Sequence, residues 1–499
     1  MNVDWPKRLH GTVRLYATRG ATAEIQIDAN SEIADTCDMH LLALCPGLAW
    51  QRPPTTRRSF VAGGAGVMMG DWRDKLMNPF GAAPAEAAVP RSPGSKGPTN
   101  EVVRTVNGIR HKRLGAGDII VSEVGLGTQR WGSSDFNGPD EELCHKFMDR
   151  AVLDGGVNLI DTAEQYPIPS DRARPEGDTE RIIGRWMAKD KGRRQKVVLA
   201  SKITGGQNVN AKNIKRDLEG TLQRLGTDYL DVYLLHWPAR YSPQANWGQS
   251  LEYKLDFDIY SSPRASFEEI AGAMGDMIRE GKLRGWGMCN DNCYGLTASA
   301  YSARALGVPP PVAMQNDYSI INRRIEENGL SEAASPLHEN TGFMAYNVLA
   351  GGVLTGKYLD VPAATDDADR TRGMANRVKP RGRMDEVGWG QTLYRYRSGP
   401  ADAATREYAA LAKKYKMSLT ELAIRWAQQR SAVTSTLLGH TSMAQLDETL
   451  AFYAKKEPLP EQLLWEVDRV HMKNRNPIWS STRVGKDWDG QGEIGEPIP

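Results

Sequence analysis

Eight short apolar segments alternate with longer amphipathic segments along most of this chain. Each apolar segment has the length and composition of a buried strand, and the alternation begins near residue 105. The strand segments are 122–128, 157–161, 197–202, 230–236, 284–290, 311–316, 342–347 and 433–439. Helical patterns lie between them at 141–155, 211–226, 266–282, 325–340, 401–415 and 418–430. Strands and helices in this order predict an α/β fold, a (β/α)8 barrel.

An open, doubly wound sheet is the main alternative to the barrel. Such a sheet normally carries a glycine fingerprint, GxGxxG, between its first strand and the following helix. Here the first strand runs into GLGTQRWG, residues 125–132, which lacks this spacing and does not lead directly into a helix. The sequence therefore favours the barrel.

The N-terminal part of the chain has a different composition. Residues 78–100 are rich in Ala, Pro and Gly, and 51–72 hold an Arg-Arg pair before a short apolar run. These features are typical of a targeting segment, but the acids within 1–50 argue against a transit peptide. The location is therefore either an organelle, of plastid type, or the cytoplasm. We divide the chain into an extension expected to be disordered, with a candidate targeting segment and linker (1–104), the barrel (105–475) and a C-terminal tail (476–499).

The charge balance and the cysteines limit the kinds of partner. The formal net charge is +2, from 63 basic and 61 acidic residues, which gives no attraction to nucleic acid or an anionic membrane. No apolar run reaches the roughly 18 residues that a membrane-spanning helix needs, so no membrane insertion is expected. The five cysteines form neither a CxxC pair nor a zinc-like cluster. Reduced structural thiols and no metal are therefore expected.

Three consecutive predicted strands end in ionisable residues, Asp161, Lys202 and His236. Tyr166 lies in the loop after the first of these strands. In a (β/α)8 barrel the C-terminal ends of all strands meet at one mouth, where active sites form. Taken singly, each residue is better explained without a function: Asp161 as a loop or helix-cap acid, Lys202 as a solvated strand end, Tyr166 as a loop aromatic and His236 as a core histidine. Their occurrence at successive strand ends of one barrel indicates a catalytic site.

These four side chains suit proton transfer to a carbonyl group. A free tyrosine has a pKa of about 10, and the Lys202 ammonium is expected to lower the pKa of Tyr166, while Asp161 keeps Lys202 protonated. A neutral His236 can donate a hydrogen bond to a substrate carbonyl. Protonating a carbonyl oxygen is useful when hydride reaches its carbon, which requires a nicotinamide cofactor. The sequence thus predicts an oxidoreductase with Tyr166 as general acid.

Residues 105–475 resemble the aldo-keto reductase family. The segments NLIDTAEQY (158–166), VVLASK (197–202) and LDVYLLHWP (230–238) carry that family's Asp, Tyr, Lys and His in order. The chain is most similar to a branch with bacterial reductases of the tyrosine-auxotrophy-suppressor type and potassium-channel β subunits. The resemblance implies a barrel with an N-terminal hairpin (108–122) across its bottom, and NADPH, or else NAD, as cofactor. It implies reduction of an aldehyde or ketone to an alcohol, or alternatively a regulatory subunit that binds the cofactor with little turnover.

The resemblance also implies cofactor contacts. The nicotinamide end is expected at Gly127, Thr128, Cys289, Asn290, Gln315 and Tyr346. The pyrophosphate is expected at Leu349, Thr355, Gly356, Lys357 and Arg383. The adenosine end is expected at Gly439, Thr441, Gln445, Glu448 and Thr449. Cys289 replaces the family's usual serine and is a weaker donor. A helix that starts near Ser442 would direct its N-terminus at a 2′-phosphate, which favours NADP over NAD.

The predicted substrate is a small carbonyl compound. Gln129, Trp131 and Trp237 are expected to line the mouth of the barrel, as is the long insert at 238–264. An aromatic mouth favours apolar or aromatic aldehydes and ketones.

Overall fold

The computed structural model describes residues 95–133, 138–173, 175–242, 253, 255–260, 264–359, 382–385, 396, 399–475 and 477–478. The chain divides into two units, 1–85 and 86–499, and every described residue belongs to the second. The candidate targeting segment and most of the predicted C-terminal tail lie outside the described residues.

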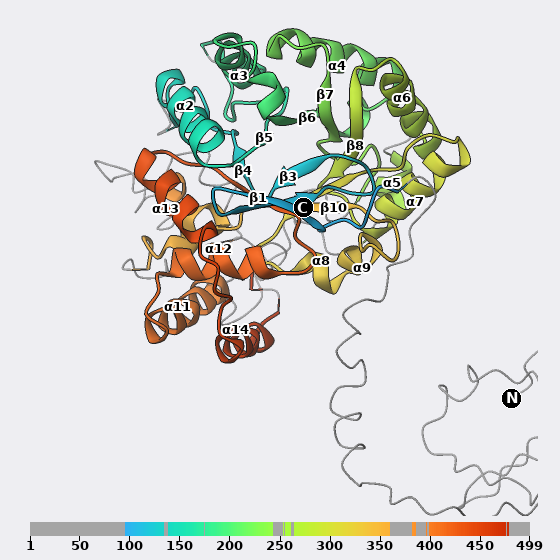
Figure 1. The fold of residues 1–499 in the computed structure, drawn as a ribbon. Coiled ribbons are helices and arrows are strands. Elements are labelled where there is room, and N and C mark those ends of the chain that lie inside the picture. The colour runs from blue at the N-terminus through green and yellow to red at the C-terminus, as the bar shows by residue number, and fades with distance from the viewer. Residues whose placement is uncertain are drawn as a thin grey trace, which may run out of the picture. The chain divides into compact units, whose positions relative to one another are not determined.

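Eight parallel strands form a closed barrel that helices surround (Figure 1). The strands are β4 (Val124–Gly127), β5 (Leu159–Asp161), β6 (Val198–Ile203), β7 (Leu230–Leu235), β8 (Leu283–Cys289), β9 (Ala313–Asp317), β10 (Gly342–Tyr346) and β11 (Ser435–Leu438). Strands that follow one another in the sequence pair with each other, and β11 also pairs with β4, which closes the sheet. All eight predicted strand segments are confirmed, and with them the predicted (β/α)8 barrel.

Helices surround the strands, and several of them begin at a residue whose side chain caps the first turn. The surrounding helices are α2 (Glu141–Met148), α3 (Asp178–Ala188), α4 (Ala211–Leu225), α5 (Leu255–Tyr260), α6 (Phe267–Arg279), α7 (Cys293–Ala305), α8 (Arg324–Glu327), α9 (Leu330–Ala333), α11 (Gly399–Lys414), α12 (Leu419–Gln429), α13 (Met443–Tyr453) and α14 (Glu461–Lys473). Asp140, Asn210 and Ser266 each accept a hydrogen bond from the backbone N–H three residues further on. These bonds satisfy donors that the first helical turn leaves free. Gly226, in the left-handed region (φ 65°), ends α4.

The predicted helix at 325–340 is wrong. The structure has two short helices there, α8 and α9, followed by turns. Gly329 lies between them with φ 78°, a conformation that residues with side chains rarely adopt. The apolar periodicity of this segment comes from two separate short helices. Helix α8 buries Ile325 and helix α9 buries Leu330.

A three-stranded antiparallel sheet precedes the barrel, and we call it the plug. It consists of β1 (Val102–Val106), β2 (Ile109–Arg113) and β3 (Ile120–Ser122). The predicted hairpin at 108–122 is confirmed as β2 and β3, while β1 spans the predicted domain boundary at residue 105. Leu114, Ile119 and Val121 pack in one apolar cluster with the side chains of the barrel interior. The plug therefore fills the end of the barrel where the strands begin, and leaves the opposite end for a site.

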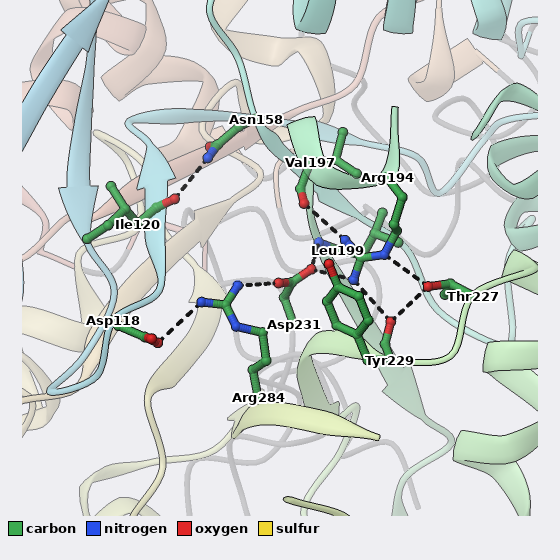
Figure 2. A network of polar contacts seen from close by, with 10 residues as sticks. All are labelled: Asp118, Ile120, Asn158, Arg194, Val197, Leu199, Thr227, Tyr229, Asp231 and Arg284. Atoms are coloured by element: carbon green, nitrogen blue, oxygen red, sulfur yellow. Dashed lines mark hydrogen bonds and ion pairs between the residues drawn. The ribbon is translucent and has the colours of Figure 1, made fainter. Parts of the chain in front are cut away.

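A buried carboxylate connects three barrel strands with the plug (Figure 2). Asp231 in β7 is 1% exposed, and its Oδ2 accepts hydrogen bonds from Arg194 Nη2 at 2.8 Å and from Leu199 N in β6 at 2.9 Å. Its Oδ1 accepts from Arg284 Nη1 in β8 at 2.5 Å. Arg284 Nη2 also donates to Asp118, in the loop between β2 and β3, at 3.2 Å. Asp231 thus pairs with two arginines at the closed end of the barrel, and one of them, Arg284, also pairs with Asp118.

Candidate active site

One residue at or just beyond the C-terminal end of each barrel strand faces the barrel interior. Side chains alternate along a strand, so Lys202 faces the same side as Val198 and Ala200, which belong to the interior apolar cluster. The same alternation in every strand gives the interior residues Gly127, Asp161, Lys202, His236, Cys289, Gln315, Tyr346 and Gly439. The sequence predicted each of them for the site, so the barrel brings together residues that are remote in the chain.

Lys202 and Asp161 form a buried ion pair between β6 and β5. Lys202 Nζ donates to both carboxylate oxygens at 2.8 Å and to the Thr162 carbonyl at 2.7 Å. Lys202 is 0% exposed and Asp161 is 4% exposed. Burial lowers the pKa of Lys202, but the charge and hydrogen bonds of Asp161, together with Tyr166 and Cys289, outweigh burial and leave that pKa above its usual value. The lysine therefore stays charged inside the barrel.

Tyr166 lies against this ion pair, in the loop after β5. Lys202 Nζ is 5.1 Å from the centre of its ring. The loop is held by hydrogen bonds from Tyr166 N to the Ala163 carbonyl at 3.1 Å and from Gly177 N to the Tyr166 carbonyl at 3.0 Å. Burial raises the pKa of Tyr166 to about 12, and Lys202 opposes only part of this effect. Lys202 thus lowers the pKa of Tyr166 in the predicted direction, but burial outweighs this effect in the protein alone.

His236 completes the group of four. Its ring meets the Tyr166 ring edge-on with centres 5.7 Å apart, and it stacks on Trp237 at 6.1 Å. Burial, followed by the nearby Lys202 charge, holds the pKa of His236 well below its usual value, so the ring is neutral near pH 7. Within the described part of the chain, its buried Nδ1 has no hydrogen-bond partner. The imidazole is thus a neutral polar group beside the phenol.

The residues predicted for the nicotinamide carboxamide adjoin these four. Gln315 Nε2 donates to Asp161 Oδ1 at 2.7 Å, and Cys289 Sγ lies 3.5 Å from Gln315 Oε1. Asn290 Nδ2 donates to the His236 carbonyl at 2.9 Å. Tyr346 Oη donates to Asn290 Oδ1 at 2.5 Å. The predicted carboxamide contacts and the predicted proton-transfer residues therefore form one connected set.

Two glycines leave a gap in the mouth between β4 and β11. A Cβ on Gly127 would lie 3.5 Å from Gly439 N, and one on Gly439 would lie 3.4 Å from Gly127 O. Side chains at these positions would fill the gap. Thr128 turns away from it, because its Oγ1 donates to the Asp161 carbonyl at 2.8 Å. Backbone without side chains at this point of the mouth leaves room for a flat or extended part of a dinucleotide.

The loop predicted to contact the cofactor's pyrophosphate has glycines that let the backbone approach a phosphate closely, and a lysine that supplies positive charge. Between Leu349 and Lys357 the chain turns through Gly351, Gly352 and Gly356 with φ of 65°, 97° and 79°. Thr355 Oγ1 donates to the Gly352 carbonyl at 2.8 Å. A Cβ on Gly382 would lie 2.3 Å from Lys357 Nζ, so this lysine and the 382–385 segment are adjacent. Next to Gly382, Arg383 Nη2 donates at 2.8 Å to Gln129, a predicted substrate residue.

The predicted adenosine end begins with α13. Ser442 caps this helix by accepting from Gln445 N at 3.3 Å. The side chain of Gln445 in turn accepts from Thr441 N at 2.8 Å and from Thr441 Oγ1 at 3.1 Å. Glu448 is exposed, as the predicted contact requires. Thr449 is 5% exposed and its Oγ1 lies 3.1 Å from His440 Nε2, a position that does not favour the predicted cofactor contact.

The stability of the protein is expected to fall on acidification because of His440. Burial lowers the pKa of His440 to about 4, whereas an unfolded histidine titrates near pH 6.5. Between these values the unfolded chain binds a proton that the folded chain does not, so the free energy of unfolding decreases as the pH falls. The free energy of unfolding should be measured by urea titration at pH 7 and at pH 5. The difference between His440→Gln and the wild type is expected to be smaller at pH 5 than at pH 7. An equal difference at the two pH values would contradict a lowered pKa of His440 in the folded protein.

The predicted substrate residues separate into two groups. Gln129 and Trp237 are partly exposed at the mouth. Trp131 is 2% exposed and packs against Phe147, with ring centres 6.4 Å apart, which does not favour contact with a substrate. Most of the insert at 238–264 lies outside the described residues.

One ion pair beside the site was not predicted from the sequence. Arg240 Nη2 and Nη1 donate to the two carboxylate oxygens of Asp291 at 2.6 and 2.9 Å. The guanidinium also lies 5.5 Å from the Phe267 ring and 5.2 Å from the Tyr294 ring. This pair joins the loop after β7, which carries His236, to the loop after β8. In the sequence, this pair is indicated only by Asp291, an acid that directly follows the predicted strand 284–290.

The described residues contain neither a cluster suited to a metal ion nor a helix suited to crossing a membrane. In that part of the chain, no group of three or more His, Cys, Asp or Glu side chains is arranged to hold a metal ion. Likewise, no helix among those residues combines the length and the apolar composition needed to cross a membrane.

The fold and the residues at its mouth define a (β/α)8-barrel protein with a candidate active site at the C-terminal strand ends. Residues 123–471 match the Aldo/keto reductase family, and the chain belongs to that family. It is 32% identical over 375 residues to "Protein tas" of Escherichia coli strain K12, an alignment that covers 73% of this chain and 98% of that protein. It is 30% identical over 296 residues to an "Aldo-keto reductase" of Babesia bovis, covering 57% of this chain and 98% of that protein. Membership of the family implies an NADP-dependent oxidoreductase.

Proposed function

We propose that this protein reduces an aldehyde or a ketone to an alcohol, with NADPH as the hydride donor. The observation that carries the proposal is the buried Lys202–Asp161 pair, at 2.8 Å, beside the phenol of Tyr166 and the neutral imidazole of His236. A purely structural ion pair gives no reason for a phenol and an imidazole at the same place. Perturbed ionisable groups at the mouth of a barrel are the usual mark of a catalytic site.

Each of the four side chains has a separate task in this reaction. When bound, NADPH supplies hydride to the carbonyl carbon. Tyr166 donates its hydroxyl proton to the carbonyl oxygen, and the Lys202 ammonium stabilises the phenolate that remains. Asp161 keeps Lys202 charged within the apolar interior. His236 donates a hydrogen bond to the same oxygen and orients it.

Consumption of NADPH with an aromatic aldehyde tests the proposed reaction. The partly exposed Trp237 beside His236 favours an apolar or aromatic substrate. Purified protein is expected to oxidise NADPH when an activated aldehyde such as nitrobenzaldehyde is added, and to form one alcohol for each NADPH. Consumption no faster than without protein, across a panel of aromatic and aliphatic aldehydes and ketones, would contradict the proposal.

NADPH is expected to bind more tightly than NADH, by about tenfold, because an anion at a helix N-terminus gains up to about 1–2 kcal/mol. The relevant terminus is that of α13 at Ser442, beside Thr441 and Gln445. No lysine or arginine lies in the segment 439–450, so a much larger preference is not expected. Quenching of tryptophan fluorescence on titration with each cofactor measures both affinities. Equal affinities would show that α13 does not bind the 2′-phosphate.

A further inference from the structure

Gln315 spans the barrel interior from β9 to β5. It is 2% exposed, and its Nε2 donates to Asp161 Oδ1 at 2.7 Å. Its Oε1 faces the thiol of Cys289, with 3.5 Å between Oε1 and Sγ. The opposite orientation of the amide would place its oxygen against a carboxylate, so the bond to Asp161 fixes the orientation.

This bond makes Gln315 part of the environment of the ion pair. A buried carboxylate remains charged only if donors replace the water that it has lost. Asp161 has two such donors among the described side chains, Lys202 on both oxygens and Gln315 on Oδ1. Without Gln315, Lys202 would be the remaining described side-chain donor to Asp161 Oδ1. More of the negative charge of Asp161 would then act on the neighbouring groups.

We infer, on the basis of the proposed function, that Gln315 is a positioning residue that acts on the Tyr166 proton through Asp161 and Lys202. The carboxamide contact implied by the family resemblance is a separate role, because an amide has a second N–H and a second lone pair. Gln315 can therefore hold Asp161 and contact a cofactor at the same time.

The direction of the effect follows from the groups that face Tyr166. These are Asp161 from β5, Lys202 from β6, His236 after β7 and Cys289 from β8. Burial keeps His236 neutral and raises the pKa of Cys289, so Asp161 and Lys202 are the charged members of this group near pH 7. Loss of the Gln315 hydrogen bond increases the effective negative charge beside the phenol, which disfavours the phenolate.

Gln315→Leu tests this link through the pH dependence of the reverse reaction. Oxidation of an aromatic alcohol with NADP⁺ needs the phenolate, so its rate rises with pH as Tyr166 ionises. In the variant the midpoint of this rise is expected to move up by about one pH unit, with kcat reduced and the KM of the alcohol unchanged. If Gln315 only binds the cofactor, Gln315→Leu will change the affinity for NADP⁺ and keep the wild-type midpoint. That result would overturn the inference.

Gln315→Glu tests the bond to Asp161 without a cofactor. A protonated glutamic acid can still donate to Asp161, whereas an ionised one repels it, so its pKa in the folded protein is raised. The free energy of unfolding of the Gln315→Glu variant is therefore expected to match that of the wild type near pH 4.5. It should fall below the wild-type value as the pH rises towards the raised pKa of the new carboxyl group. Gln428→Leu is the matched control for Gln315→Leu, because Gln428 on α12 is also buried (6% exposed) and donates to the Tyr453 carbonyl instead; it should leave the midpoint of alcohol oxidation unchanged.

The two measurements separate the failure of the inference from that of the proposed function. Absence of turnover in the wild-type protein contradicts the proposed function. In that case the unfolding experiment still decides whether Gln315 acts on Asp161. A Gln315→Glu variant whose loss of stability is independent of pH overturns the link.

Discussion

Tyr166→Phe is expected to lower kcat for carbonyl reduction by about 10²–10⁴-fold, the usual contribution of a positioned general acid. The substitution removes one hydroxyl from a side chain that is only 6% exposed, so it preserves most of the packing. The phenyl ring still fills the space between Lys202 and His236. Initial rates at saturating NADPH and aldehyde provide the measurement. A loss of less than about threefold would show that another group supplies the proton.

Two controls separate a chemical effect of Tyr166→Phe from a structural one. The affinity for NADPH and the midpoint of urea unfolding should remain close to those of the wild type. Tyr301→Phe is the matched variant, because Tyr301 is 71% exposed on α7. That variant should retain wild-type kcat. A similar loss of rate in both variants would indicate a general effect on folding rather than a lost proton donor.

Asp231→Ala is expected to destabilise the protein by about 3–5 kcal/mol, the usual effect of removing one partner from a buried ion pair. The substitution would leave Arg194, whose side chain is 11% exposed, without its carboxylate. Arg284 would keep only Asp118, at 3.2 Å in the plug. The backbone N–H of Leu199 would also lose its acceptor. The free energy of unfolding in urea at pH 7 measures the effect.

A surface ion pair provides the comparison for Asp231. Asp276 pairs with Arg279 one turn further along α6, and both side chains are more than half exposed. Asp276→Ala should therefore cost less than about 1 kcal/mol. If the two substitutions have equal effects, then the network in Figure 2 does not hold the closed end of the barrel together.

The fold could be predicted from the sequence where apolar periodicity and burial agree. Each strand buries nearly all of its residues, so it reads as a short apolar run, and α4 buries one regular stripe. Helix α7 was not predicted, because it reverses the usual pattern. Its exposed face carries Tyr294 and Tyr301, while small residues such as Ala300 and Ala303 are buried. At 325–340 a single glycine, Gly329, divides the predicted helix.

The site could be predicted as far as strand ends define it. Asp161, Lys202 and His236 each end an apolar run, so their position at one mouth of the barrel could be predicted from the sequence. The pKa of Tyr166 could not, because it depends on the balance between burial and the charge of Lys202. Nor does a sequence show which residues outside the strands turn inward, and for this reason the burial of Trp131 and Thr449 was not predicted.

Transfer of deuterium from NADPH labelled at its hydride-donating carbon to an aromatic aldehyde tests most directly whether the mouth of this barrel carries out carbonyl reduction. The alcohol is analysed by mass spectrometry after incubation with wild-type protein or with Tyr166→Phe. One deuterium on the carbon that bears the new hydroxyl, formed far more slowly by the variant, is the predicted result. Alcohol without deuterium, or no alcohol even with protein and cofactor at equal concentrations, would contradict it.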